Sequence, residues 1–311
     1  MRQLKLKRVL SKEEDEHLRG VGKDKLGNEK LPLHPDHTEY DLLLRPEDGE
    51  VEALKEDGSL LFRVIPGVFE RADMERGFRH LKKVHGDCTT RPETTGTKNV
   101  LQQYADGSDT NMLRAPKEVT EEYRKKGCRA SILGYMGPGG LHKYCRQTAW
   151  TGEDPEVLIG IKPLLRAANR VFKEYAPEQY AEQERHIQQL DSAEDFAIYD
   201  TVFSTVTVNL KLSTTYHRDE GDFEKGMGVM FTLGEFKGGW LVFPAFRVAI
   251  DYQPGSVILA DVHETHGNMP NIEGERITCV LYARHNINEC GTAEEVMERM
   301  AGTMSIHARE D

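Results

Sequence analysis

A histidine and a carboxylate stand two residues apart in His217-Arg218-Asp219. On an extended backbone, side chains at this spacing lie on the same face, so both could bind one ion. A histidine from a later strand would complete a 2-His-1-carboxylate triad, which holds non-haem Fe(II) and leaves other positions open for further ligands. His263 and His266 are the candidates for this third ligand. The spacing is compatible with an iron centre, although a His-x-Asp triplet alone also occurs by chance in many proteins.

An arginine that could bind a carboxylate follows His266 by ten residues. Arg276 and Thr278 belong to an apolar run that ends at Tyr282, and the period of two in a strand puts their side chains on one face. A guanidinium with a neighbouring hydroxyl suits the distal carboxylate of 2-oxoglutarate. The pair predicts a cosubstrate site beside the metal.

The composition limits the class of protein. The 311 residues include 41 Lys+Arg and 52 Asp+Glu, a formal net charge of −11, which disfavours nucleic-acid binding by overall charge alone. A basic groove formed locally on the surface is still possible. Candidate cations for it are Arg79 with Lys82-Lys83, Arg124-Lys125-Lys126 with Arg129, and the basic N-terminus.

The cysteines and the N-terminus indicate a compartment. The five cysteines are odd in number, scattered and never spaced as CxxC, which argues against a disulfide framework and a structural zinc site. The N-terminus lacks the apolar region of a secretory signal, and no apolar run approaches the roughly 18 residues of a membrane span. We expect a cytoplasmic or nuclear protein in a reducing compartment, with no membrane partner. A viral protein that works inside a cell would also fit.

Three regions follow one another along the chain. Residues 1–59 are charged with little periodicity and predict a partly ordered extension with short elements. Residues 60–290 are expected to form the main domain, and 291–311 a C-terminal helix and tail that begins with a capping box at Thr292. Long loops are expected at 87–111 and 136–140.

The main domain combines helices with many short strands. A strand is expected at 60–65, and helices at 70–84 and 156–174, the second kinked or split by Pro163. From 202 to 282, short apolar runs alternate with Gly and Pro turns, which is typical of an antiparallel sandwich or barrel. Trp240, Phe243, Phe246 and Tyr282 are expected in its core. The fold class is therefore α+β.

Several motifs in this region resemble the TET/JBP family of Fe(II) and 2-oxoglutarate-dependent dioxygenases. They are FSTVTVN (203–209), HRDEGDF (217–223), GGWLVFP (238–244), QPGSV (253–257) and VHETHGN (262–268). The resemblance extends over about 130–284 and is absent before roughly residue 60. It implies a double-stranded β-helix (a jelly roll, cupin-like) at about 200–285, supported by N-terminal helices.

The resemblance also implies a role for individual residues. It assigns His217, Asp219 and His266 to the iron, which makes them the catalytic centre, and leaves His263 outside it. Arg276, with Thr278 and the weaker candidate Asn209, would bind 2-oxoglutarate. The implied base contacts are Asp222, Arg284, His285 and Arg146. Arg284 stands where the family often has a histidine, which leaves the preferred base open.

The activity implied is oxidation of the 5-methyl group of 5-methylcytosine, or of thymine, in DNA or RNA to hydroxymethyl or beyond. It would require Fe(II), 2-oxoglutarate and O2, with ascorbate as reductant, and a target base flipped from the helix. No obligate protein partner is inferred. Two alternatives remain: a hydroxylase of the same mechanism acting on a peptide side chain or small molecule, and a catalytically inactive jelly-roll binding module.

Overall fold

The computed structural model describes residues 1–23, 30–84, 86, 128–139, 142, 144–188, 196–270, 272–292 and 294–298. The expected loop at 87–111 and the basic residues 124–126 lie outside these described residues. Within it, no helix is both long enough and apolar enough to cross a bilayer. The capping box at Thr292 is present, since its hydroxyl accepts from Glu295 N and the Glu295 carboxylate accepts from Thr292 N.

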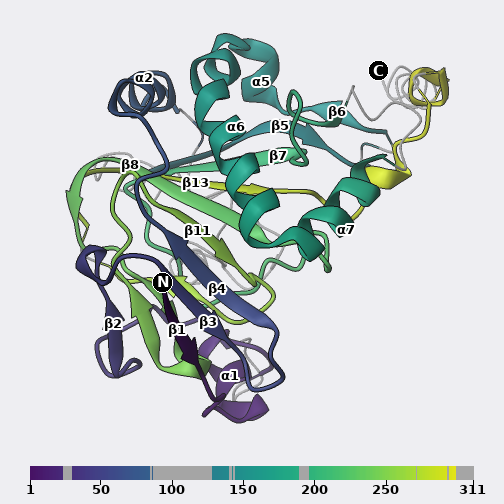
Figure 1. Ribbon diagram of the computed structural model, residues 1–311. Coiled ribbons are helices and arrows are strands. Elements are labelled where there is room, and N and C mark those ends of the chain that lie inside the picture. Colours follow the sequence, from purple (N-terminus) through teal and green to yellow (C-terminus); the bar gives the residue numbers. More distant parts are fainter. Residues whose placement is uncertain are drawn as a thin grey trace, which may run out of the picture.

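Two β-sheets make up the centre of the molecule (Figure 1). The large sheet has the order β1 (Arg2–Lys5), β3 (Val51–Leu54), β4 (Leu60–Ile65), β11 (Val257–Ala260), β8 (Gly228–Lys237), β13 (Glu273–Tyr282), β7 (Thr205–Leu210), β5 (Arg129–Met136) and β6 (Arg146–Gln147). The small sheet has the order β12 (Gly267–Asn268), β9 (Leu241–Phe243), β10 (Val248–Ile250) and β2 (Leu42–Leu44).

The strands of the C-terminal half alternate between the two sheets. The chain runs through β7 and β8 in the large sheet and then through β9 and β10 in the small sheet. It returns to the large sheet in β11, crosses to the small sheet in β12 and ends in the large sheet in β13. Between β7 and β8, the segment 214–217 lies beside β12, with Asn268 N donating to Thr214 O and a bridge between His217 and His266. This is the winding of a double-stranded β-helix, and the expected fold is confirmed.

Helices cover the outer face of the large sheet (Figure 1). They are α2 (Arg71–Leu81), α5 (Ala149–Glu153), α6 (Glu156–Tyr175) and α7 (Pro177–Gln188). Because side chains alternate along β13, Ile277, Cys279 and Leu281 pack in the core beneath these helices. Thr278, Val280 and Tyr282 instead line a cavity on the opposite face, between the sheets.

Pro163 does not divide helix α6. The proline was expected to kink the helix or split it, and α6 runs unbroken from Glu156 to Tyr175 with Pro163 inside. A proline removes the hydrogen bond to the carbonyl four residues earlier, here that of Ile159. The side chain of Ile159 is 63% exposed, so this carbonyl lies on the solvent side, where water can satisfy it. The buried stripe of α6 keeps both halves on one core.

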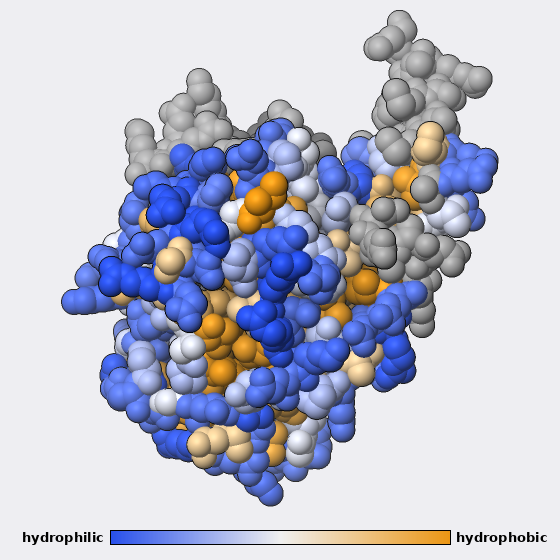
Figure 2. Space-filling view, turned by 45° about the horizontal axis from the view of Figure 1, so that its top comes forward, coloured by the Kyte–Doolittle hydropathy of each residue, from blue (hydrophilic) through white to orange (hydrophobic). Residues whose placement is uncertain are grey.

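The N-terminal region extends both sheets at the same edge. Strand β4 pairs with β11 of the large sheet, and β2 pairs with β10 of the small sheet. Helix α1 (Lys12–Leu18) lies between β1 and β2 in sequence and buries Asp15. The short elements expected in residues 1–59 are therefore built onto the jelly roll. Figure 2 shows a face that is mostly hydrophilic, with several smaller hydrophobic areas among hydrophilic residues.

Candidate metal centre

Three side chains converge where the segment 217–219 lies beside 262–268. His217 Nε2 is 3.5 Å from Asp219 Oδ1, and His266 Nε2 is 3.8 Å from Asp219 Oδ2. All three ligand atoms lie within 4.8 Å of one another, and this is the one such group found among the described residues. Two imidazole nitrogens and a carboxylate at these separations fit one divalent ion of the facial-triad type.

Backbone contacts orient both histidine rings. The Nδ1 atom of His217 is 2.7 Å from Thr215 O, and that of His266 is 3.0 Å from Glu264 O. A carbonyl can only accept, so each Nδ1 carries the proton and each Nε2 presents its lone pair toward Asp219. The two backbones hold each other through reciprocal N–H to O bonds of 3.0 Å between His217 and His266. The ligand set is thus oriented by the fold before any ion binds.

A cavity of about 100 Å³ opens beside the triad between the two sheets. Among its lining residues are the three triad members together with Asn209, Asp222 and Thr278, all of them candidates from the sequence. Asn209 in β7 stands directly opposite Thr278 in β13. The structure therefore brings these candidates, from four separate segments, to one space.

Arg276 is a buried cation behind Tyr252 and does not itself line the cavity. Its side chain is 1% exposed, and Nη2 donates a 2.7 Å hydrogen bond to the hydroxyl of Tyr252, which lines the cavity. Arg276 Nε and Nη1 and Thr278 Oγ1 are buried with no hydrogen-bond partner among the described residues. Because unpaired buried N–H groups are costly, their presence fits a site that a carboxylate ligand completes.

Two features of the Arg276 site were not identified from the sequence. Tyr252 directly precedes the QPGSV turn, and its hydroxyl fixes the guanidinium. Gly239 has φ +69°, and a Cβ there would come within 2.9 Å of Arg276 Nη1. The Gly238-Gly239 pair, visible in the sequence as turn punctuation, therefore also leaves room for the arginine.

The candidates for substrate contact lie around Asp222. Asp222 and Arg284 form an isolated β-bridge, and Arg284 Nη2 is 3.5 Å from the hydroxyl of Tyr282. Tyr282 is 7% exposed, as expected of a core residue, but it also lines the cavity. Arg284, His285 and Arg146 do not line it. The exposed His285 ring lies against Gly221 O, 2.9 Å from Nδ1.

Arg146 stands near Arg284, whose charge affects it. Burial lowers the pKa of Arg146, and the charge of Arg284 lowers it further, against the opposite effect of Tyr144. His186 of α7 contacts the same region. Its Nε2 lies 2.9 Å from Arg284 O, and its ring stacks on that of Phe223 with 4.0 Å between the ring centroids. Two guanidiniums therefore lie on this side of the site, although the chain is acidic overall.

Other candidates lie elsewhere. His263 is outside the triad and is paired with Asp261, 3.6 Å from Nδ1 to Oδ1. Arg79, Lys82 and Lys83 lie in or just after α2, on the outer face of the large sheet, and Lys83 pairs with Asp154 at 3.7 Å. The structure therefore does not bring this basic cluster to the cavity.

The cysteines depart from the expectation drawn from their spacing. Cys145 and Cys290 form a disulfide, with Cα atoms 5.2 Å apart, whereas Cys128 and Cys279 do not form disulfides. The fold places the segment before β6 against the segment after β13, in a small core with Ile187 and Ile287. Partners separated by 145 residues could not be recognised from local spacing.

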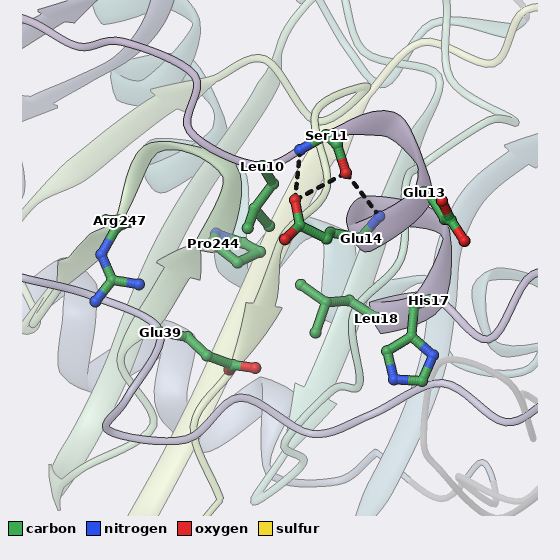
Figure 3. Close-up of a pocket in the computed structure, with 9 residues that line it drawn as sticks. All are labelled: Leu10, Ser11, Glu13, Glu14, His17, Leu18, Glu39, Pro244 and Arg247. Carbon is green, nitrogen blue, oxygen red and sulfur yellow. Dashed lines mark hydrogen bonds between the residues drawn. The ribbon is translucent and has the colours of Figure 1, made fainter.

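A larger cavity, of about 590 Å³, lies between α1 and the turn at Pro244–Phe246 (Figure 3). Acidic side chains of Glu13, Glu14 and Glu39 line it together with His17. It holds none of the triad residues, and no second metal-binding group was found in the described part of the chain. Size alone therefore does not identify the reactive site.

The family Tet/JBP, described as the oxygenase domain of the 2OGFeDO superfamily, matches residues 135–285. This range contains the triad, the candidates for 2-oxoglutarate binding and the candidates for base contact, but not the basic cluster in and after α2.

Among curated proteins, the chain is 32% identical over 181 residues to the thymine dioxygenase JBP1 of Crithidia fasciculata, covering 55% of this chain and 22% of that protein. It is 33% identical over 196 residues to the bifunctional helicase and thymine dioxygenase JBP2 of Leishmania major, and this match covers 57% of this chain and 17% of that protein. The chain thus spans about a fifth of the length of these relatives. A solved structure, NgTET1 in complex with 5mC DNA, is 13% identical with a TM-score of 0.48 over 84% of this chain and 91% of that one.

Proposed function

We propose that the chain is an Fe(II) and 2-oxoglutarate-dependent dioxygenase that oxidises the 5-methyl group of a pyrimidine in nucleic acid. The match of residues 135–285 to the Tet/JBP family of oxygenase domains supports this proposal. The observation that carries the proposal is the placement of His217, Asp219 and His266 on one cavity with a buried arginine beside it. An inactive binding module would have no use for both features. The curated relatives named thymine dioxygenases support the substrate class.

The chain's own residues would hold the cofactors. His217, Asp219 and His266 would bind Fe(II) through Nε2 atoms and a carboxylate oxygen. Bound Fe(II), with 2-oxoglutarate and O2, supplies the oxidising power that an unactivated methyl group requires. Ascorbate is the expected reductant that keeps the iron ferrous.

Arg276 would bind the distal carboxylate of 2-oxoglutarate. Its Nε and Nη1 groups would donate to the carboxylate oxygens, and Thr278 would donate from Oγ1. Tyr252 holds Nη2 at 2.7 Å, which prevents the guanidinium from rotating away. Because these groups are buried, the ion pair forms in a low-dielectric space, where it is strong and geometrically selective. Asn209, opposite Thr278, is a further candidate for this ligand.

Asp222 and Arg284 would read the base. The Asp222 carboxylate can accept from the 4-amino group of 5-methylcytosine, whereas the Arg284 guanidinium can donate to O4 of thymine. Arg146 and His285 would contact the nucleotide outside the cavity. With acceptor and donor both present, cytosine and thymine are both chemically reasonable bases.

The target nucleotide would leave the base stack to reach the triad. The cavity lies between two β-sheets, and a methyl group inside a duplex is shielded by its neighbours, so flipping or a single strand is required. The two arginines beside the cavity would provide local charge for the backbone. No protein partner is required by this scheme.

The direct test is mass spectrometry of nucleosides after incubation with Fe(II), 2-oxoglutarate and ascorbate. The substrates are DNA and RNA that contain 5-methylcytosine and unmodified DNA that contains thymine. We expect 5-hydroxymethyl or more oxidised bases that require the triad. Succinate formation without a modified base would contradict the nucleic-acid substrate and favour a peptide or small molecule, while absence of both would contradict the enzyme itself.

Replacing Asp222 with alanine should separate base recognition from cosubstrate turnover. Loss of one hydrogen bond to a charged group costs about 1.5–3 kcal/mol, or roughly ten- to hundredfold in base oxidation. Decarboxylation of 2-oxoglutarate without a base should fall much less, since Asp222 is not needed for it. Both rates are measured in parallel, with Glu220→Ala, an exposed neighbour, as the matched control. Equal loss of both activities would show that Asp222 has a structural role.

A further inference from the structure

A buried carboxylate in the N-terminal region is bound to an arginine between two of the proposed iron ligands. Asp15 of α1 is 1% exposed, and its Oδ2 accepts from Arg218 Nη2 at 2.7 Å. Arg19 Nε donates to the same oxygen at 3.3 Å, and Arg8 Nη1 lies 4.0 Å from Oδ1. A buried carboxylate is tolerated when it is paired in this way. Asp15 is therefore the common partner of three guanidiniums.

Arg218 connects this carboxylate to both metal-bearing segments, defined here as 217–219 and 262–266. It stands between His217 and Asp219 in the chain, and its Nε donates to Thr265 Oγ1 at 3.2 Å, next to His266. One planar guanidinium thus connects Asp15 of α1 to Thr265, which precedes His266, and belongs to the residue between the other two ligands. Such a fork fixes geometry more strictly than a flexible ammonium.

A second set of contacts holds the other metal-bearing segment. The Glu264 carboxylate pairs with Arg8, and also with Lys55 Nζ at 3.5 Å. Lys55 Nζ donates to Asp261 Oδ2 at 2.8 Å. Burial alone would raise the pKa of Asp261, but hydrogen bonds from His263 and Lys55 outweigh it and lower the pKa to about 2. Glu264 is also the residue whose backbone carbonyl orients the His266 ring.

These contacts come from outside the region that the family matches. Arg8, Asp15, Arg19 and Lys55, together called the N-terminal clamp, all precede residue 135. The backbone follows the same pattern, since Tyr216 N, directly before the first ligand, donates to Leu33 O at 2.8 Å. Figure 3 shows that α1 itself is fixed at its start by the reciprocal bonds between Ser11 and Glu14. The clamp is therefore an ordered part of the molecule.

We propose that the N-terminal clamp sets the separation of the two metal-bearing segments, and that Asp15 is a positioning residue for the iron site through Arg218. This rests on the proposed metal site. Removing the Asp15 charge would leave three guanidiniums in one place without their common partner, and their repulsion would displace Arg218. Because Arg218 is flanked by two ligands, its displacement would change their mutual geometry.

The test is cobalt(II) binding to the full chain, measured by calorimetry and by the visible absorption of the bound ion. We expect Asp15→Asn to weaken cobalt affinity by roughly 10- to 100-fold, the usual effect of losing an outer partner of metal ligands, and to alter the absorption bands. The matched control is Asp48→Asn, which removes a carboxylate paired with Arg2 at 2.9 Å, away from the metal-bearing segments. It should bind cobalt as the unsubstituted chain does.

Urea unfolding of the metal-free protein distinguishes positioning from stability. A folded Asp15→Asn variant with unchanged cobalt affinity and spectrum would overturn the inference, whatever its unfolding midpoint. Failure of the unsubstituted chain to bind cobalt would overturn the metal site, and the inference with it. If Asp15→Asn does not fold, Arg218→Lys keeps the charge and removes the fork, and should weaken cobalt affinity in the same range.

A double-mutant cycle tests the route through Arg218. Asp15→Asn and Arg218→Gln break the same contact. The cobalt affinity of the double variant should therefore be close to that of whichever single variant binds cobalt less tightly. Independent, multiplicative losses would contradict transmission through Arg218.

Discussion

Replacing both His217 and Asp219 with alanine should reduce 2-oxoglutarate turnover to the level of a protein-free blank. The double variant keeps one of three ligands, and a single imidazole cannot hold a divalent ion in the geometry of the triad. The side chains are 19% and 29% exposed and line a cavity, so their removal should leave the packed core unchanged. Succinate formation measures turnover, and circular dichroism with urea unfolding measures the folded state.

The histidine selected by geometry provides the control for this result. His263→Ala should retain cobalt binding, because the ring is paired with Asp261 outside the triad. His266→Ala should lose it, because Nε2 is one of the three convergent ligand atoms. Full turnover of the His217/Asp219 double variant, or the reverse order for the two histidines, would contradict the assignment of the iron site.

Arg276→Ala should raise the 2-oxoglutarate concentration needed for half-maximal turnover by roughly 100-fold. Two hydrogen bonds from a buried guanidinium to a carboxylate contribute about 3 kcal/mol, which corresponds to that factor. Maximal turnover at saturating 2-oxoglutarate should fall much less, because Arg276 does not contact the metal ligands. The measurement is succinate formation across a wide range of 2-oxoglutarate concentration.

Two variants refine the prediction at Arg276. Arg276→Lys keeps the charge but not the planar fork of the guanidinium. Its half-saturating 2-oxoglutarate concentration should therefore lie between those of the alanine variant and the unsubstituted chain. Tyr252→Phe removes only the hydroxyl that holds Nη2 and should have a smaller effect in the same direction. An unchanged half-saturation value for Arg276→Ala would remove the residue from the cosubstrate site.

The sequence predicted those parts of the site that follow from local periodicity. His217 with Asp219, and Arg276 with Thr278, are each two residues apart, and the strand period places each pair on one face whatever the rest of the fold does. The short strands from 202 onward were visible for the same reason. By contrast, the partners of Asp15 and Cys145 could not be read, because Arg218 lies 203 residues from Asp15 and Cys290 lies 145 residues from Cys145.

Tertiary context also decided what local propensity left open. Pro163 stays inside one helix because the buried stripe of α6 holds both halves on the same core. The N-terminal region looked weakly structured because β1, β2 and β3 are only three or four residues long and are separated by charged segments. Their order comes from pairing with one another and with strands of the jelly roll, which no local pattern reveals.

The pairing of β4 with β11 and of β2 with β10 determines how the chain can fold while it is synthesised. Strand β4 leaves the ribosome about 190 residues before β11, which takes about 10–40 s at 5–20 residues per second. During that interval the β3–β4 hairpin has no partner for its open edge, a state that favours aggregation. The segment proposed to clamp the iron ligands is thus made long before the strands on which it docks, so the proposed metal site can form only after β11 and β12 have been translated.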